Sequence, residues 1–166
     1  MSEMLGNQYF MARKYELAEP VLESCLRKYP DNKSIKKKLI VCYTQTGKIE
    51  QALPTFLSLI KDDIEFIINT DPIDDDCPCP ELIYDLENSD NSKDELMFEY
   101  EKLGILWLYC DVNKSFFYFK KAVSLMPDKT VLKSIHVILK NYIDGTSPKK
   151  NISKSISATQ YNGHYF

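Results

Sequence analysis

The sequence predicts an all-α array of helical hairpins, and two observations in its first 64 residues carry that prediction. Six positions recur with a spacing of 34 residues, and a period of this length is typical of stacked helical hairpins. The apolar residues of each copy also recur at helical spacing, which gives each helix one face to bury. The recurring residues are Leu5, Tyr9, Lys14, Ala18, Pro20 and Leu22, matched by Leu39, Tyr43, Lys48, Ala52, Pro54 and Phe56.

The first copy predicts an amphipathic hairpin that a proline ends. Pro30 cannot donate the next backbone hydrogen bond of a helix, and it restricts the residue before it. We therefore place the first repeat at about residues 3–30, with helices expected over residues 3–12 and 15–28.

The second copy repeats this plan without the closing proline. Helices are expected over residues 34–46 and 49–69, and Gly47 between them supplies the positive φ that such a turn needs. Ile64 stands where the first copy has its proline, so the second helix is expected to run on. The second repeat accordingly covers residues 34–69.

A third copy further along the chain completes a known pattern. The residues that carry it are Leu5, Gly6, Tyr9, Ala18, Leu22, Cys25 and Pro30, then Leu39, Tyr43, Gly47, Ala52 and Phe56, then Leu103, Gly104, Trp107, Phe119, Ala122 and Pro127. This signature resembles that of the tetratricopeptide repeats. The resemblance implies a right-handed superhelix of three hairpins, with the third repeat at about residues 97–127. It also implies a protein-interaction module that binds a peptide or helix of a partner.

A single amphipathic helix follows the third repeat. We expect it over residues 129–143, where its apolar stripe caps the face that the last hairpin of an array leaves open. One domain then spans residues 1–144. Residues 145–166 are polar and contain no acidic residue, so we expect a mobile tail there.

An acidic segment interrupts the repeats. Residues 71–95 contain ten Asp and Glu residues against one basic residue, Lys93. A segment this long inside a compact array is usually functional or disordered, and we expect one short helix within it, at residues 80–86. Because Lys33, Lys36, Lys37 and Lys38 cluster on the second repeat, the acidic segment could fold back over a groove; the alternative is that both charge runs are solvated surface.

Composition and charge narrow the class of partner. The net charge of −3 and the pI of about 5.5 argue against a nucleic acid or a membrane surface as the main partner. The N-terminal residues lack the positive flank and the apolar run of a signal peptide, so a cytoplasmic protein is the expectation. The five cysteines are scattered, which favours reduced thiols. The sequence leaves homo-oligomerisation open.

The first helices of the repeats should line a concave groove. By register, the third repeat contributes apolar residues to it, which suits a peptide ligand unless the cap and the acidic segment bury them. The predicted groove residues are Asn7, Phe10, Met11, Ser34, Lys37, Val41, Gln45, Phe98, Glu101, Ile105, Leu108 and Tyr109.

Two alternatives stay open beside this adaptor role. In length and acidity the chain also resembles the small cytoplasmic chaperones of bacterial type III secretion, which capture a hydrophobic partner segment. The second alternative is a metal-binding regulator, because Cys77 and Cys79 place two thiols close enough to bind a soft metal ion. We expect no enzymatic activity and no cofactor, since His136 and His164 are the only histidines and neither accompanies a nucleophile motif.

Overall fold

The computed structural model describes residues 2–90 and 93–146, and every regular element in this part of the chain is a helix. The all-α prediction is therefore confirmed. In chain order the helices are α1 (Glu3–Met11), α2 (Tyr15–Lys28), α3 (Lys33–Gln45), α4 (Ile49–Ile68), α5 (Cys79–Glu87), α6 (Lys93–Leu108) and α7 (Val112–Leu125), followed by a C-terminal helix that is described over residues 130–146.

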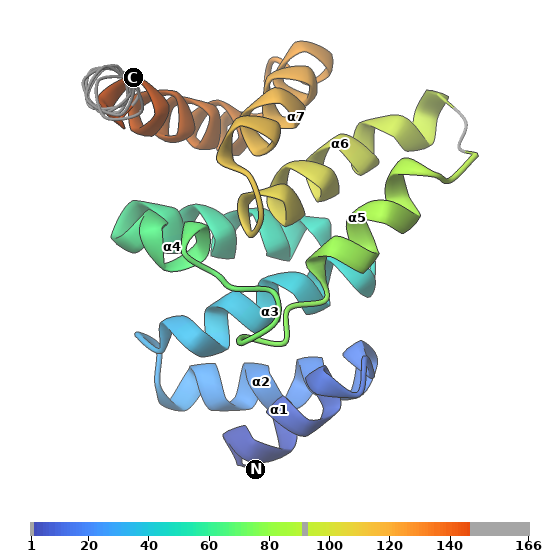
Figure 1. The fold of residues 1–166 in the computed structure, drawn as a ribbon, viewed down its shortest axis with the longest axis vertical. Coiled ribbons are helices and arrows are strands. Elements are labelled where there is room, and N and C mark those ends of the chain that lie inside the picture. The colour runs from blue at the N-terminus through green and yellow to red at the C-terminus, as the bar shows by residue number, and fades with distance from the viewer. Residues whose placement is uncertain (1, 91–92, 147–166) are drawn as a thin grey trace, which may run out of the picture.

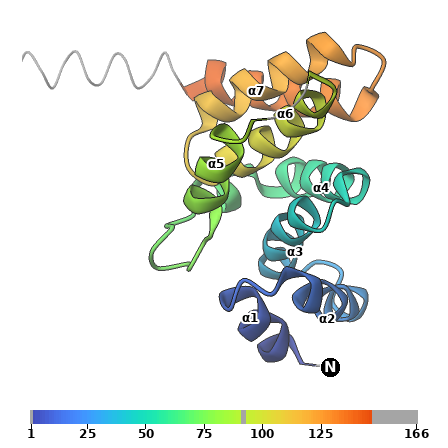
Figure 2. The same ribbon diagram turned by 90° about the vertical axis from the view of Figure 1, so that its right-hand side faces the viewer.

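The helices stack in order along the molecule. Helices α1 to α3 each pack against the next helix in sequence, whereas α4 packs against α6, which forms a hairpin with α7. Figure 1 shows this progression from the N-terminal hairpin to the C-terminal helix, and Figure 2 shows the same stack from the side. Helix α5 lies beside α6 and is an addition to the hairpin series.

The first two hairpins turn by the same backbone hydrogen bonds. Lys14 N donates to Tyr9 O, and Lys48 N donates to Tyr43 O, each at 2.9 Å. This closure needs one residue with positive φ at the end of the first helix. Gly47 fills that position with a φ of 75°, and Arg13 fills the equivalent position with a φ of 59°, so the repeat noted in the sequence is also a repeat of backbone conformation.

Two glycines mark close helix contacts in the first and third hairpins. A Cβ placed on Gly6 would lie 2.7 Å from Leu22 Cδ2, and one placed on Gly104 would lie 2.8 Å from Phe119 Cδ2. Both partners come from the second helix of the same hairpin. The absence of a side chain therefore allows α1 to approach α2, and α6 to approach α7, in the same way. In the second hairpin, a fully buried Ile40 occupies the corresponding position.

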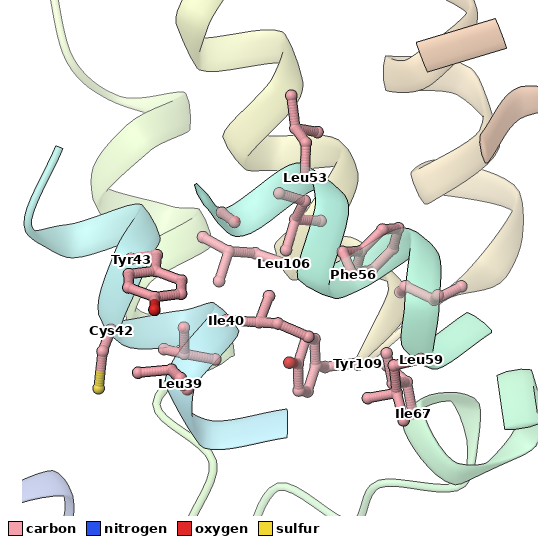
Figure 3. Close-up of a cluster of buried hydrophobic side chains, with 14 of the residues drawn as sticks. Leu39, Ile40, Cys42, Tyr43, Leu53, Phe56, Leu59, Ile67, Leu106 and Tyr109 are labelled. Carbon is pink, nitrogen blue, oxygen red and sulfur yellow. The ribbon is translucent and has the colours of Figure 1, made fainter. Parts of the chain in front are cut away.

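The core is continuous across the hairpins. Figure 3 shows Ile40 and Phe56 in one cluster with Leu106 and Tyr109, which come from the end of the α6 region. The Phe56 ring also stacks on Phe119 of α7, with ring centroids 5.6 Å apart. Burial of such large side chains is the main stabilising term of the fold, and it joins the second repeat directly to the third hairpin.

Helix α4 is not the straight helix that its sequence predicts. Asp63 leaves the helical conformation, with φ −157° and ψ 84°, and kinks the helix there. Its carboxylate accepts a hydrogen bond from Phe66 N at 3.3 Å, as a helix N-cap does. It also accepts one from Lys33 Nζ at 3.1 Å. The kink redirects the last turn of α4 and brings Phe66 toward α3, where Lys37 Nζ lies 5.1 Å from the centre of its ring.

Candidate functional site

The segment between α4 and α5, residues 70–78, forms a compact turn that we call the strap. The Asp71 carboxylate accepts hydrogen bonds from Ile73 N at 2.9 Å and from Asp74 N at 3.2 Å. Backbone bonds from Asp75 N to Asp71 O and from Cys77 N to Pro72 O close the turn further. The acidic strap thus has a defined shape, and Figure 1 shows it crossing in front of α3.

Ion pairs tie the strap and α5 to the first two hairpins. Arg13 Nη2 lies 3.4 Å from Asp76 Oδ1 and 3.5 Å from Glu81 Oε1. Lys37 Nζ lies 3.5 Å from Asp75 Oδ2. These groups are partly exposed, so each pair contributes roughly 0.2–1 kcal/mol. The contacts hold the acidic segment over α1 and α3 without anchoring it strongly.

A cavity of about 280 Å³ lies beneath the strap, on the side of α1 and α3. Its apolar walls come from four separate elements, and its polar rim joins lysines of α3 to carboxylates of the strap. The lining residues are Phe10, Ser34, Lys37, Lys38, Val41, Phe66, Asp74, Asp75, Cys77 and Tyr109.

Hydrogen bonds fix the wall of this cavity. Tyr109 OH donates to Lys37 O at 2.6 Å, which joins the end of the α6 region to α3. Lys38 Nζ donates to Asn7 Oδ1 at 2.8 Å, which joins α3 to α1. Burial lowers the pKa of Lys38, while the carboxylate of Glu3 opposes that shift. The cavity therefore offers aromatic and aliphatic surface with an ammonium group at its edge.

Comparison with known proteins identifies the first part of this scaffold. Residues 9–63 match the family described as tetratricopeptide repeat. The match supports a tetratricopeptide repeat scaffold in this part of the chain. No curated protein and no solved structure matches the chain in two further searches. Tetratricopeptide repeats typically bind protein partners.

Five groove residues predicted from the repeat register line the cavity in the structure. They are Phe10, Ser34, Lys37, Val41 and Tyr109. Asn7 lies next to the cavity through its bond to Lys38. The register of the tetratricopeptide repeats thus points these side chains to one place, although Phe10, Val41 and Tyr109 are almost fully buried there.

The prediction of an exposed apolar patch in the third hairpin is wrong for most of its members. Ile105 and Leu108 are fully buried in the core, as is Tyr109. Glu101 is also fully buried, and Lys129 Nζ donates to its Oε1 at 2.8 Å. The physical reason is that α6 packs against α4, α5 and α7 and that Lys129 closes on Glu101, so Ile105, Leu108 and Glu101 do not line the cavity.

The other predicted groove residues are exposed but lie outside the cavity. Met11 and Phe98 are exposed by 60% and 53%, and Gln45 is exposed beside Thr44. Register alone placed them on the inner face of the repeats, and the cavity occupies only part of that face.

Sequence reasoning missed five residues of the cavity as groove residues. Lys38 comes from α3, Phe66 enters through the kink at Asp63, and Asp74, Asp75 and Cys77 enter with the strap. The acidic run opposite a lysine cluster was the available signal for the strap. No periodic signal marks the kink.

The residues considered for chemistry are dispersed. Within residues 2–90 and 93–146, no group of three His, Cys, Asp or Glu side chains is arranged to hold a metal ion. The imidazole of His136 stacks on the Phe116 ring, with ring centroids 4.9 Å apart. His164 and the predicted tail at residues 147–166 lie outside the described residues. In the described part, no helix is both long and apolar enough to cross a membrane.

Proposed function

We propose that the chain is a non-catalytic protein-interaction module that binds a peptide or helix of a partner on the concave side of its repeats. The observation that supports this most directly is the cavity beneath the strap. It combines apolar walls from Phe10, Val41 and Phe66 with the ammonium groups of Lys37 and Lys38. Such a mixture of apolar surface and a few oriented polar groups suits a peptide segment.

The strap is the competitor of that partner in our proposal. It covers the cavity through the Arg13 and Lys37 ion pairs, which are individually weak. A partner segment that reaches the same rim displaces the strap at a modest free-energy cost. The strap lowers the apparent affinity of every such partner by the same factor, so only partners with a high intrinsic affinity stay bound.

The extent of the module is also part of the proposal. One domain spans residues 1–144, and the α6–α7 hairpin is its third repeat although the family match ends at residue 63. The close contact at Gly104, which parallels that at Gly6, supports this reading. A cytoplasmic location is part of the same proposal, and the net charge of −3 supports a partner other than a nucleic acid or an anionic membrane surface.

The secretion-chaperone alternative shares the same groove and differs only in the partner, so one experiment serves both. We would select peptides from a displayed random library on a strap variant with Asp74, Asp75 and Asp76 changed to Asn. Asn tolerates the positive φ of 46° at Asp76. Affinities of the selected peptides would then be measured by fluorescence anisotropy for the wild type and for two matched tyrosine variants.

Ser34→Tyr fills the cavity, and Ser58→Tyr places the same side chain on the exposed surface of α4. We expect Ser34→Tyr to abolish binding and Ser58→Tyr to retain it. Loss of the strap ion pairs should tighten binding about tenfold at low salt. Equal binding by both tyrosine variants, or no selectable peptide, would overturn the groove proposal.

A further inference from the structure

Two thiols stand where the strap joins α5. Cys77 is half-buried in the cavity wall, and Cys79, the first residue of α5, is fully buried. Pro78 between them has a helical conformation, with φ −80° and ψ 0°. Helix geometry places the flanking Cα atoms about 5.4 Å apart. Disulfides span roughly 4.4–6.8 Å between Cα atoms, so these two sulfurs can bond without unfolding the turn.

The surroundings of the two thiols differ in a way that assigns them different roles. Hydrogen bonds from the Cys79 thiol to the Cys77 sulfur lower the pKa of Cys77, and burial opposes this shift only in part. The Cys79 backbone N–H and the charges of Lys37 and Arg13 lower the pKa further. Burial raises the pKa of Cys79 well above its ordinary value. Because the thiolate is the nucleophile, Cys77 is the thiol that attacks and Cys79 is the one that stays protonated beside it.

We propose that Cys77 and Cys79 are a dithiol site that a hydroperoxide oxidises to a disulfide. The Cys77 thiolate attacks one peroxide oxygen, the O–O bond breaks, and the leaving oxygen takes a proton, which gives an alcohol or water and a sulfenic acid on Cys77. The Cys79 sulfur then attacks the Cys77 sulfur and displaces hydroxide, which leaves as water with the Cys79 proton. Two electrons pass from the thiols to the peroxide.

This site is independent of the proposed peptide binding, but the two meet at one wall. Cys77 lines the cavity, and Lys37 is one of the charges that act on it. Oxidation consumes the thiolate there and cross-links the end of the strap to the first turn of α5. A disulfide would therefore change the cavity wall at the point where the strap is held.

The test treats the reduced full-length chain with hydrogen peroxide and maps the cysteines by mass spectrometry after alkylation. We expect the peptide that contains Cys77 and Cys79 to lose two hydrogen atoms. Cys77→Ser should slow this loss at least about tenfold. Cys79→Ser should stop the reaction at a Cys77 sulfenic acid, which dimedone traps. Cys110→Ser, which removes an exposed thiol near both, should leave the reaction unchanged.

Three results would overturn the assignment. The first is a disulfide between Cys77 and Cys110, and the second is a sulfenic acid on Cys79. The third is an oxidation rate of Cys77 in the wild type that is no higher than that of Cys110. The third result is measured on the wild type, so it tests the assignment even if the Cys79→Ser variant does not fold.

Discussion

The first and third hairpins share a packing solution and differ in what covers their inner face. Gly6 and Gly104 each allow the two helices of a hairpin to approach closely. In the first hairpin, Met11 remains exposed. In the third, α5 packs on α6, and Ile105 and Leu108 are buried. The repeat signature therefore determines how a hairpin closes, whereas the inserted segment determines which inner surface stays available.

A buried carboxylate also has different partners in the first half of the molecule, helices α1 to α4, and in the second half, from α5 onward. Glu19 accepts hydrogen bonds from both Thr46 and Lys48, one on each oxygen. Glu101 accepts one from Lys129, and its Oε2 has no partner in the part of the chain that the structure describes. Burial raises the pKa of Glu101, while Lys129 acts in the opposite direction. The carboxylate of the second half thus depends on a single lysine.

Removing these lysines should have the largest effect on the free energy of unfolding, and the effect should differ between the two halves. We expect Lys129→Met to lower the free energy of unfolding by about 3–5 kcal/mol, because it leaves Glu101 buried and unpaired. Lys48→Met should cost clearly less, since Lys48 is 46% exposed, against 21% for Lys129, and Thr46 still donates to Glu19. Urea unfolding followed by circular dichroism measures both. Glu101→Gln combined with Lys129→Met should recover part of the loss, and equal losses in the two single variants would refute the difference.

Alanine at the two glycines should give the next largest effect. At Gly104 the added Cβ meets the Phe119 ring, which is fully buried and stacked on Phe56. Such overpacking destabilises a core by about 1–3 kcal/mol. The higher helix propensity of alanine relative to glycine, about 1 kcal/mol, offsets this loss only in part. At Gly6 the Cβ meets the flexible end of Leu22, which can rotate. We expect Gly104→Ala to lose about 1–2 kcal/mol and Gly6→Ala to stay within about 0.5 kcal/mol of the wild type in the same urea assay. The reverse order would show that Phe119 is the more adaptable neighbour.

Most of the fold could be predicted from sequence because its signals are local. Apolar spacing, Pro30 and Gly47 act within a single hairpin, and the resulting helix bounds agree with the structure to within a residue or two. The kink at Asp63 could not be predicted in this way. It depends on a carboxylate that caps a new helical turn and pairs with Lys33, which lies 30 residues away in the chain.

The candidate site was predictable to the extent that it follows repeat register. Phe10, Lys37 and Val41 line one cavity in the structure, because α1 and α3 repeat the same plan. The same reasoning failed for Ile105 and Leu108, which are fully buried. Helix α6 packs not only on α4 and α7 but also on α5, a helix that belongs to no repeat. Charge indicated the strap, but only the tertiary structure shows which lysine each carboxylate meets.

The hydrogen bonds that join α5 to α6 and α7 provide a smaller test of the difference between the two halves. Glu87 Oε1 accepts hydrogen bonds from Trp107 Nε1 at 3.0 Å and from Tyr118 OH at 2.9 Å. Glu87→Leu should cost about 1 kcal/mol and shift the fluorescence of Trp107, the single tryptophan, as α5 loosens. The matched change in the first half is Glu23→Leu, which removes the acceptor of Tyr43 OH. It should leave the emission maximum unchanged; a similar shift in both variants would contradict a local tether.

The smallest expected effect is a pH dependence confined to the second half, because the two histidines of the chain both follow α7. Burial lowers the pKa of His136 below 6.5, and Lys140 and Lys120 lower it further. The unfolded chain therefore binds a proton from about pH 6.5 downward, while the folded imidazole binds one only at lower pH. The unfolded state holds more protons in this window, so acidification below about pH 6.5 must reduce stability.

Urea unfolding at pH 7.5 and at pH 5.5 measures this effect. Between these two pH values the unfolding midpoint should fall less in His136→Leu than in the wild type. Lys120→Gln combined with Lys140→Gln should raise the His136 pKa in an NMR titration and shrink the same pH effect. If that variant left both quantities unchanged, burial against Phe116 alone would govern the titration, and the lysine charges would have no part in it.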